Sequence, residues 1–386
     1  MKFSSHSSHP PSGGKPEGGA PPLRLIAWEV TRACNLACRH CRAEAHCEPY
    51  PDELSTDEAK ALIDTFPQTG DPIIIFTGGE PLMRKDIFEL IGYAHARNLR
   101  CVMAPNGTLI TQENARKIKE AGIARCSISI DGPDATGHDA FRGTVGAFDQ
   151  AMRGIACLRE SDIEFQINTT VTKGNLSKFK EIFSLAQHLG AVAWHIFLLV
   201  PMGRATGLTD EVISAEEYED VLNWFYDFRK TTPMHLKATC APHYYRIMRQ
   251  RAKAEGLAVT PDLFGMDALT RGCLGGTGFC FISHTGQVQP CGYLETDCGN
   301  VRRTPFPDIW RFAEAFLQFR NPAAYEGKCG RCEYHRVCGG CRARAYSLTG
   351  RYMAEEPLCA YVPASVKNNA GGGRYGASET GIRREE

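Results

Sequence analysis

The sequence predicts an α/β fold: a partial, TIM-like (β/α)6 barrel followed by a small cysteine-rich domain. Short β-rich segments alternate with amphipathic segments up to about residue 200. Beyond residue 271 the sequence becomes rich in Gly and Cys, with little periodicity, and the chain of 386 residues has 17 cysteines. Strand–helix alternation indicates βαβ units and a parallel sheet, while a short Cys-rich segment folds around metal more readily than around an apolar core.

Six segments are expected as strands: 23–30, 72–76, 100–104, 125–130, 164–172 and 192–199. Amphipathic stretches between them are expected as helices: 56–66, 86–96, 112–121, 146–158 and 176–189. Two further helices, 215–230 and 243–256, follow, and Ser214 with Glu217 fits a capping box at the start of the first. The active site of such a barrel should lie at the carboxyl ends of its strands.

The domains expected are a disordered leader (1–22), the barrel (23–205), a helical linker (206–270), the cysteine-rich domain (271–362) and a flexible tail (363–386). The leader has no apolar segment and is not a secretory signal. Lys+Arg and Asp+Glu both number 44, which argues against a nucleic-acid partner. The apolar run 191–200 is too short to span a membrane. We therefore expect a cytoplasmic protein, in which cysteines bind metal rather than form disulfides.

The first cysteine group, Cys34-Asn-Leu-Ala-Cys38-Arg-His-Cys41, directly follows the first expected strand. Three thiolates this close can bind three irons of a cubane and leave the fourth iron open. A zinc site or buried free thiols are the alternatives, but a fourth ligand for closed tetrahedral zinc is missing. The spacing and position resemble the signature of the radical S-adenosylmethionine (SAM) superfamily, which implies a SAM-binding [4Fe–4S] cluster. Many members have an aromatic residue where this chain has His40.

Other strand ends resemble the SAM contacts of that superfamily. Gly78, Gly79, Glu80 and Pro81 follow the second strand and match the motif that binds the methionine amino group, although a plain βα turn is the alternative. Ser129 and Arg142 match a ribose or carboxylate contact and a methionine carboxylate contact, and for Arg142 a surface ion pair is the alternative. Asn106 follows the third strand and is either a further contact or a turn residue.

The C-terminal array resembles the SPASM extension, which binds two auxiliary [4Fe–4S] clusters. Eight cysteines are the number that two four-thiolate clusters need, and two structural zinc sites are the alternative. The resemblance implies an outer cluster on Cys329, Cys332, Cys338 and Cys359, and an inner cluster on Cys273, Cys291 and Cys341 with Cys280. If Cys280 is not a ligand, the inner cluster has an open iron. The other six cysteines are expected as plain thiols: Cys47, Cys101, Cys126, Cys157, Cys240 and Cys298.

Longer segments resemble the heme synthases of the siroheme-dependent pathway: Arg24-Leu-Ile-Ala-Trp-Glu-Val-Thr-Arg-Ala-Cys34, Ile73-Ile-Ile-Phe-Thr-Gly-Gly-Glu80 and Ala193-Trp-His-Ile-Phe-Leu-Leu-Val-Pro201. That family oxidatively decarboxylates two propionates of Fe-coproporphyrin III to vinyl groups, giving heme b. The resemblance implies this porphyrin as the substrate. We further expect a monomer that receives electrons from a reducing donor such as flavodoxin or ferredoxin.

Three alternatives stay open at this point: a related enzyme that acts on another siroheme-derived tetrapyrrole, one that modifies a peptide, and an electron carrier without catalytic activity. The short leader argues against a peptide-recognition domain, and an open SAM-sized site argues against a carrier. A porphyrin with four carboxylates needs cations around an apolar slot. The candidates, each with an ordinary structural role as the alternative, are Arg39, Arg42, His195, Arg204, His243, Tyr244 and Tyr245.

Overall fold

The computed structural model describes residues 19–366, so most of the expected leader (1–22) and tail (363–386) lies outside the described residues. Within this part of the chain, the strands form one sheet in the order β7-β6-β5-β4-β3-β2-β1-β8-β9. Neighbours from β7 to β8 pair in parallel, and β9 pairs antiparallel with β8. The order has two free ends, so the barrel is open. The partial barrel that the sequence predicts is confirmed.

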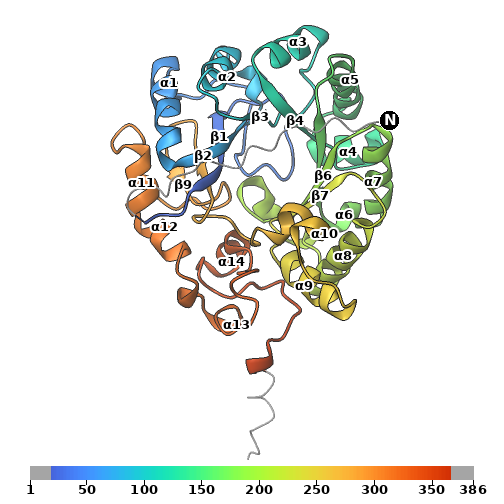
Figure 1. The fold of residues 1–386 in the computed structure, drawn as a ribbon. Coiled ribbons are helices and arrows are strands. Elements are labelled where there is room, and N and C mark those ends of the chain that lie inside the picture. Colours follow the sequence, from blue (N-terminus) through green and yellow to red (C-terminus); the bar gives the residue numbers. More distant parts are fainter. Residues whose placement is uncertain (1–18, 367–386) are drawn as a thin grey trace, which may run out of the picture.

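All six expected strands are present: β1 (Leu23–Thr31), β2 (Gly70–Gly78), β3 (Cys101–Met103), β4 (Ile123–Ser129), β5 (Phe165–Val171) and β6 (Ala193–Leu198). Helices α1 (Thr56–Thr65), α2 (Ile87–His95), α3 (Gln112–Glu120), α5 (Ala147–Glu160) and α7 (Phe179–His188) match the expected helices. Figure 1 shows these helices around the strands. Short helices α4 (Ala135–Arg142) and α6 (Lys173–Leu176) were not expected.

The segment 206–270, expected as a helical linker, also completes the barrel. Its two expected helices are α8 (Ala215–Phe228) and α9 (His243–Ala254), and the capping box of Ser214 and Glu217 is formed. Between them the structure places a seventh parallel strand, β7 (His235–Thr239), in register with β6. The expectation of a purely helical linker is corrected, because five residues of alternating burial carry too weak a pattern to be recognised in the sequence.

The apolar core lies between the sheet and the surrounding helices. On β6, Trp194 is buried and its ring lies 4.9 Å from Phe179 and 5.2 Å from Phe183 of α7, between ring centroids. The neighbouring residues His195 and Phe197 are only half-buried. Because successive strand residues point to opposite faces, these two side chains point into the barrel.

The cysteine-rich region continues the sheet of the barrel. Strand β8 (Phe279–Ile282) pairs with β1, with Leu25 opposite Phe279, and β9 (Val288–Gln289) forms the edge. The remaining helices are α10 (Pro261–Phe264), α11 (Phe306–Phe312), α12 (Glu314–Phe319), α13 (Gly327–Gly330) and α14 (Arg342–Thr349). In Figure 1, α11 lies beside α1, and the two helices are in contact. In the part of the chain that the structure describes, no helix is long and apolar enough to cross a membrane.

Candidate metal centres and cofactor site

The loop that follows β1 brings the first three cysteines together. Cys34 and Cys38 are buried, Cys41 is half-buried, and the three pack in one small cluster. Burial raises the pKa of Cys34 to about 12, so the thiol is neutral when nothing is bound to it. A metal that binds there must displace a proton, and the free energy of its binding contributes to the folding of the loop.

Nitrogen donors surround these sulfurs. The amide of Leu36 lies 3.4 Å from Cys34 Sγ, Asn106 Nδ2 lies 3.9 Å from the same atom, and Arg142 Nη1 lies 3.7 Å from Cys38 Sγ. Hydrogen bonds to sulfur are an ordinary feature of iron–sulfur sites and tune their reduction potential. The donor set therefore fits an iron–sulfur cluster with three protein ligands.

Gly78 and Gly79 hold the end of β2 against the cysteine loop. A Cβ atom at Gly79 would lie 2.3 Å from the carbonyl oxygen of Arg32 and 2.4 Å from that of Ala33, and one at Gly78 would lie 2.3 Å from the carbonyl oxygen of Thr31. The amide of Gly79 also donates to Thr31 O at 2.9 Å. These glycines are needed because the two backbones approach too closely for any side chain.

Glu80 is fully buried beside this contact. Its carboxylate accepts the amide of Asn106 at 2.6 Å and that of Leu82 at 3.0 Å. Burial raises the pKa of Glu80 to about 7, against the lowering effect of these two hydrogen bonds. Pro81, also buried, begins the short 3-10 helix Pro81–Met83. The predicted residues Glu80 and Asn106 thus lie together, next to Cys34.

Arg142, at the end of α4, is buried rather than on the surface. Arg142 pairs with Asp131. Burial alone would lower the pKa of Arg142, whereas the charge of Asp131 raises it, and the net result is a raised pKa. Its Nε atom is buried and has no hydrogen-bond partner. Asp131 belongs to the same Ser-Ile-Asp-Gly segment as Ser129, but sequence reasoning gave it no role. Ser129 itself ends β4 and is half-buried.

His40 packs beside the same pair. Its ring stacks on Phe141, with 4.1 Å between ring centroids and an interplanar angle of 4°. Burial lowers the pKa of His40 to about 3, so the ring is neutral. His40 stands directly before the third cysteine, where many superfamily members have an aromatic residue. Its neutral ring still forms a flat surface beside the cysteines.

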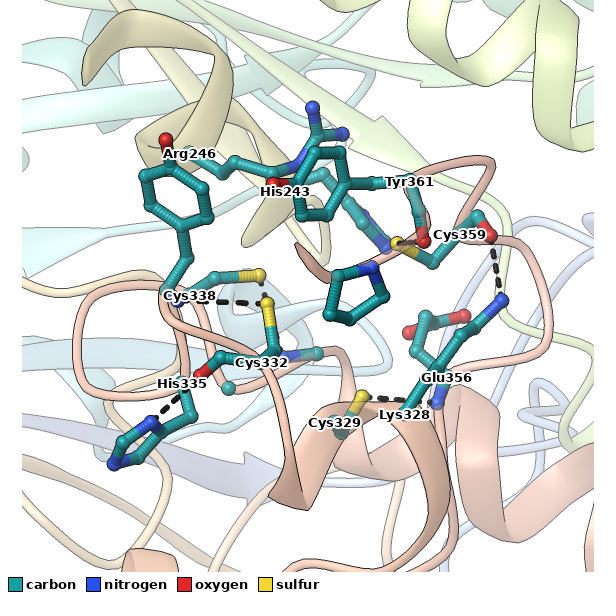
Figure 2. A pocket seen from close by; sticks show the side chains of 14 residues that line it. His243, Arg246, Lys328, Cys329, Cys332, His335, Cys338, Glu356, Cys359 and Tyr361 are labelled. Carbon is teal, nitrogen blue, oxygen red and sulfur yellow. Dashed lines mark hydrogen bonds between the residues drawn. The ribbon is translucent and has the colours of Figure 1, made fainter. Parts of the chain in front are cut away.

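The predicted outer group faces one cavity, whose lining includes Cys329, Cys332, Cys338 and Cys359. Figure 2 shows their sulfurs arranged around this cavity. Backbone amides approach three of the sulfurs at 3.3 to 3.5 Å: Glu356 N to Cys329, Tyr334 N to Cys332 and Gly340 N to Cys338. The cavity and its donors fit a cluster with four thiolate ligands.

Three of the four cysteines predicted for the inner group also lie together. Cys291 packs in one cluster with Cys341. Burial, together with the charges of Cys273 and Cys341, raises the pKa of Cys291 to about 12. The amide of Tyr293 lies 3.5 Å from Cys291 Sγ. Cys273, Cys291 and Cys341 are therefore near neighbours.

The structure does not bring Cys280 to this group. Cys280 lies in the middle of β8, opposite Ile26 of β1, and is fully buried in the main apolar core. Besides burial, which raises its pKa, the neighbouring charge that affects it is that of Cys298. The expectation for Cys280 is corrected for a geometric reason: on a strand, its side chain points to the opposite face from Phe281, on which Arg42 stacks.

Cys240, and not Cys280, lies beside Cys341 and Cys291. Its thiol forms a hydrogen bond with that of Cys341. Sequence reasoning treated it as a plain thiol. The signal that could have found it is its place directly after a strand, but that strand, β7, was missed.

In residues 19–366, no three His, Cys, Asp or Glu side chains lie close enough to hold a single metal ion. Zinc needs its ligands at roughly 2.0 to 2.3 Å, so each cysteine group would have to contract around it.

The expected porphyrin anchors have structural partners for the most part. Arg42 pairs with Glu29 at 2.8 Å, and Arg204 donates to the carbonyl oxygens of Cys38 and Ala45, both at 2.9 Å. His195 forms a hydrogen bond with the side chain of Gln166, and the Tyr245 hydroxyl donates to the Asp267 carboxylate. Tyr244 is buried, and Arg39 is exposed. His243 is buried, lines the outer cavity and has no partner on either ring nitrogen.

Two family models match the chain. The model described as the radical SAM superfamily matches residues 28–186, and the one described as an iron-sulfur cluster-binding domain, SPASM, matches residues 273–342. The first range contains the cysteine loop and the ends of β2 to β4, and the second contains most of the C-terminal array.

Named relatives match over nearly their whole length. An AdoMet-dependent heme synthase of Nitratidesulfovibrio vulgaris strain Hildenborough is 75% identical over 90% of this chain and 95% of that protein. Another, of Methanosarcina barkeri strain Fusaro, is 53% identical over 88% and 97%. The crystal structure of Streptococcus suis SuiB bound to S-adenosylmethionine is similar in fold, with a TM-score of 0.68 at 16% identity, over 89% of this chain and 78% of that one.

Proposed function

Because the chain belongs to the radical SAM superfamily and, within it, to the AdoMet-dependent heme synthases, we propose that it converts two propionates of Fe-coproporphyrin III to vinyl groups and so forms heme b. The identity of 75% across 95% of a named heme synthase carries this proposal. The chain is a radical SAM enzyme, and its two domains imply SAM and multiple [4Fe–4S] clusters as cofactors.

When bound, these cofactors supply a 5′-deoxyadenosyl radical and redox centres that can take up an electron. We propose that Cys34, Cys38 and Cys41 hold the SAM cluster, and that one iron is left for SAM. We propose that Glu80 accepts the SAM ammonium group, because it lies beside the cysteine loop and each carboxylate oxygen can accept a further hydrogen bond besides the one from Asn106 or Leu82. The unpartnered Nε of Arg142 is the donor available for the SAM carboxylate.

Each propionate would lose one hydrogen atom, CO2 and one electron. The methylene next to the pyrrole would give up a hydrogen atom to the 5′-deoxyadenosyl radical, and the carbon–carbon bond to the carboxylate would break. CO2 would leave, and one electron would pass to an oxidised redox centre as the vinyl group forms. We propose that a small reducing protein such as flavodoxin or ferredoxin supplies the electrons that begin each turnover, and that the enzyme acts as a monomer.

Anaerobic incubation with SAM, dithionite and Fe-coproporphyrin III tests the proposal. We expect 5′-deoxyadenosine, and a porphyrin mass that falls by two formate equivalents in sequence. The Cys34→Ala variant should yield neither product. A porphyrin that stays unchanged while a siroheme-derived tetrapyrrole is converted would replace this substrate by that one, and no 5′-deoxyadenosine with any tetrapyrrole would contradict the enzymatic proposal.

A further inference from the structure

We propose that Cys240 is the fourth thiolate of the inner auxiliary cluster, with Cys273, Cys291 and Cys341. The inference rests on the iron–sulfur part of the proposed function and not on the identity of the porphyrin. Cys240 packs in the same cluster as Cys291 and Cys341. Its thiol also forms a side-chain hydrogen bond with that of Cys341.

Cys240 is held in this position by its backbone. It lies in the turn between β7 and α9, with φ of 54°, in the left-handed region that side chains other than Gly rarely adopt. Its carbonyl oxygen accepts the hydroxyl of Tyr218 at 2.8 Å and Arg344 Nη2 at 3.0 Å. A strained conformation persists only where surrounding contacts hold it, and here they direct the thiol at the cysteine group.

The same buried arginine connects this turn to Cys341. Arg344 has no exposed surface and lies 3.5 Å from the carboxylate of Glu356. Glu356 in turn accepts the amide of Cys341 at 2.7 Å, where Cys341 precedes helix α14. One network therefore fixes the backbones on both sides of the Cys240–Cys341 contact, one from the barrel and one from the SPASM domain.

Cys280 cannot replace Cys240 without a rearrangement of the sheet. It lies between two hydrogen-bonded neighbours, β1 and β9, and its side chain belongs to the main apolar core. A cluster ligated there would require β8 to turn over, which would expose Ile282 and Cys280 together on the other face.

The fourth thiolate decides what the inner cluster can do. With four protein ligands, no iron is open to a substrate group, so this cluster passes electrons and does not bind the porphyrin. The ligand set also contains one residue from the carboxyl end of a barrel strand and three from the SPASM domain. The cluster therefore joins the two domains at the mouth of the barrel.

The test compares Cys240→Ala with Cys280→Ala, both in full-length protein that also carries Cys34→Ala, Cys38→Ala and Cys41→Ala. This background leaves only the auxiliary clusters, so anaerobic reconstitution should give about eight iron atoms per chain. We expect Cys240→Ala to lower this to about four, or to leave a cluster with a changed EPR spectrum on reduction. Cys280→Ala should keep about eight iron atoms and the parent spectrum.

The Cys240→Ser variant controls for a general folding defect in Cys240→Ala. A serine oxygen can replace the thiolate, so this variant should retain iron, with an altered EPR or Mössbauer spectrum of one cluster only. Full iron and unchanged spectra in both Cys240 variants would overturn the inference, as would loss of a cluster in Cys280→Ala alone. Because iron and spectra are measured without porphyrin, a wrong substrate would not affect this result.

Discussion

Arg142 Nη2 lies 2.5 Å from Asp131 Oδ2, and both side chains are buried. Asp131 also accepts the amide of Thr170 at 2.6 Å, and Arg142 reaches Cys38 through Nη1. The pair therefore connects the ends of β4 and β5 to the cysteine loop. A residue that the sequence predicts as a SAM contact thus also has a structural role.

Replacing Arg142 with Gln should destabilise the protein strongly. It leaves the Asp131 carboxylate buried without its partner, which costs about 3–5 kcal/mol. Arg125→Gln is the matched control, because its pair with Glu164, just before the neighbouring strand β5, is partly exposed and such pairs contribute ~1 kcal/mol or less. Thermal unfolding of the reconstituted proteins measures both. The double variant Arg142→Gln, Asp131→Asn should recover part of the loss, and no recovery would argue against the pair.

Gly79→Ala should disrupt the SAM cluster without affecting the auxiliary clusters. The added methyl group must push away the carbonyl oxygens of Arg32 and Ala33, which directly precede Cys34. We expect the iron content to fall by about four atoms per chain and 5′-deoxyadenosine formation to be lost. Gly92→Ala, in α2, is the control, since its Cβ would meet no atom within 4 Å. Equal iron content in the two variants would contradict this role of Gly79.

Much of this architecture is visible in the sequence because it rests on local patterns. The six expected strands and the helices between them have strong periodicity, and Cys34, Glu80 and Asn106 follow strands directly, so the topology of a parallel sheet brings them to one edge. The outer cysteines are close in sequence for the most part, and they share one cavity.

The inner cysteine group was predicted incompletely because its geometry depends on long-range contacts. Cys280 is near Cys273 in sequence, but the pairing of β8 with β1 turns its side chain into the core. Cys240 is distant in sequence, and only the pairing of β7 with β6 brings it to the barrel mouth. Likewise, the partner of Arg142 depends on how α4 packs, and α4 was not expected.

Lys328→Gln should lower the reduction potential of the outer cluster. Lys328 lines the cavity of Cys329, Cys332, Cys338 and Cys359, and its Nζ donates to the carbonyl oxygen of Cys359 at 2.6 Å. Loss of a positive charge there favours the oxidised, less negative cluster, by on the order of 50 mV for a contribution of ~1 kcal/mol. EPR-monitored redox titration measures it. Lys253→Gln, an exposed change on α9, should leave all potentials as they are.

Asp267→Asn should remove a pH dependence of stability. Burial raises the pKa of Asp267 to about 6, although Tyr245, Lys237, Arg229 and Arg249 lower it. Because the folded protein binds this proton more tightly than the unfolded chain, the resulting stabilisation is present below pH 4 and is lost as the pH rises through 6. Between pH 5 and 7.5 the melting temperature of the parent protein should therefore fall relative to that of Asp267→Asn, for a free-energy difference of about 1.4 kcal/mol, since about one pH unit of the shift lies in this range. The amide can still accept the Tyr245 hydroxyl, so the hydrogen bond itself is retained.

Asp262→Asn, exposed on α10, is the control and should have the melting temperature of the parent protein at each pH. If the plots of melting temperature against pH are parallel for Asp267→Asn and the parent, the carboxyl of Asp267 titrates no differently in the folded and unfolded chains, and the prediction is wrong.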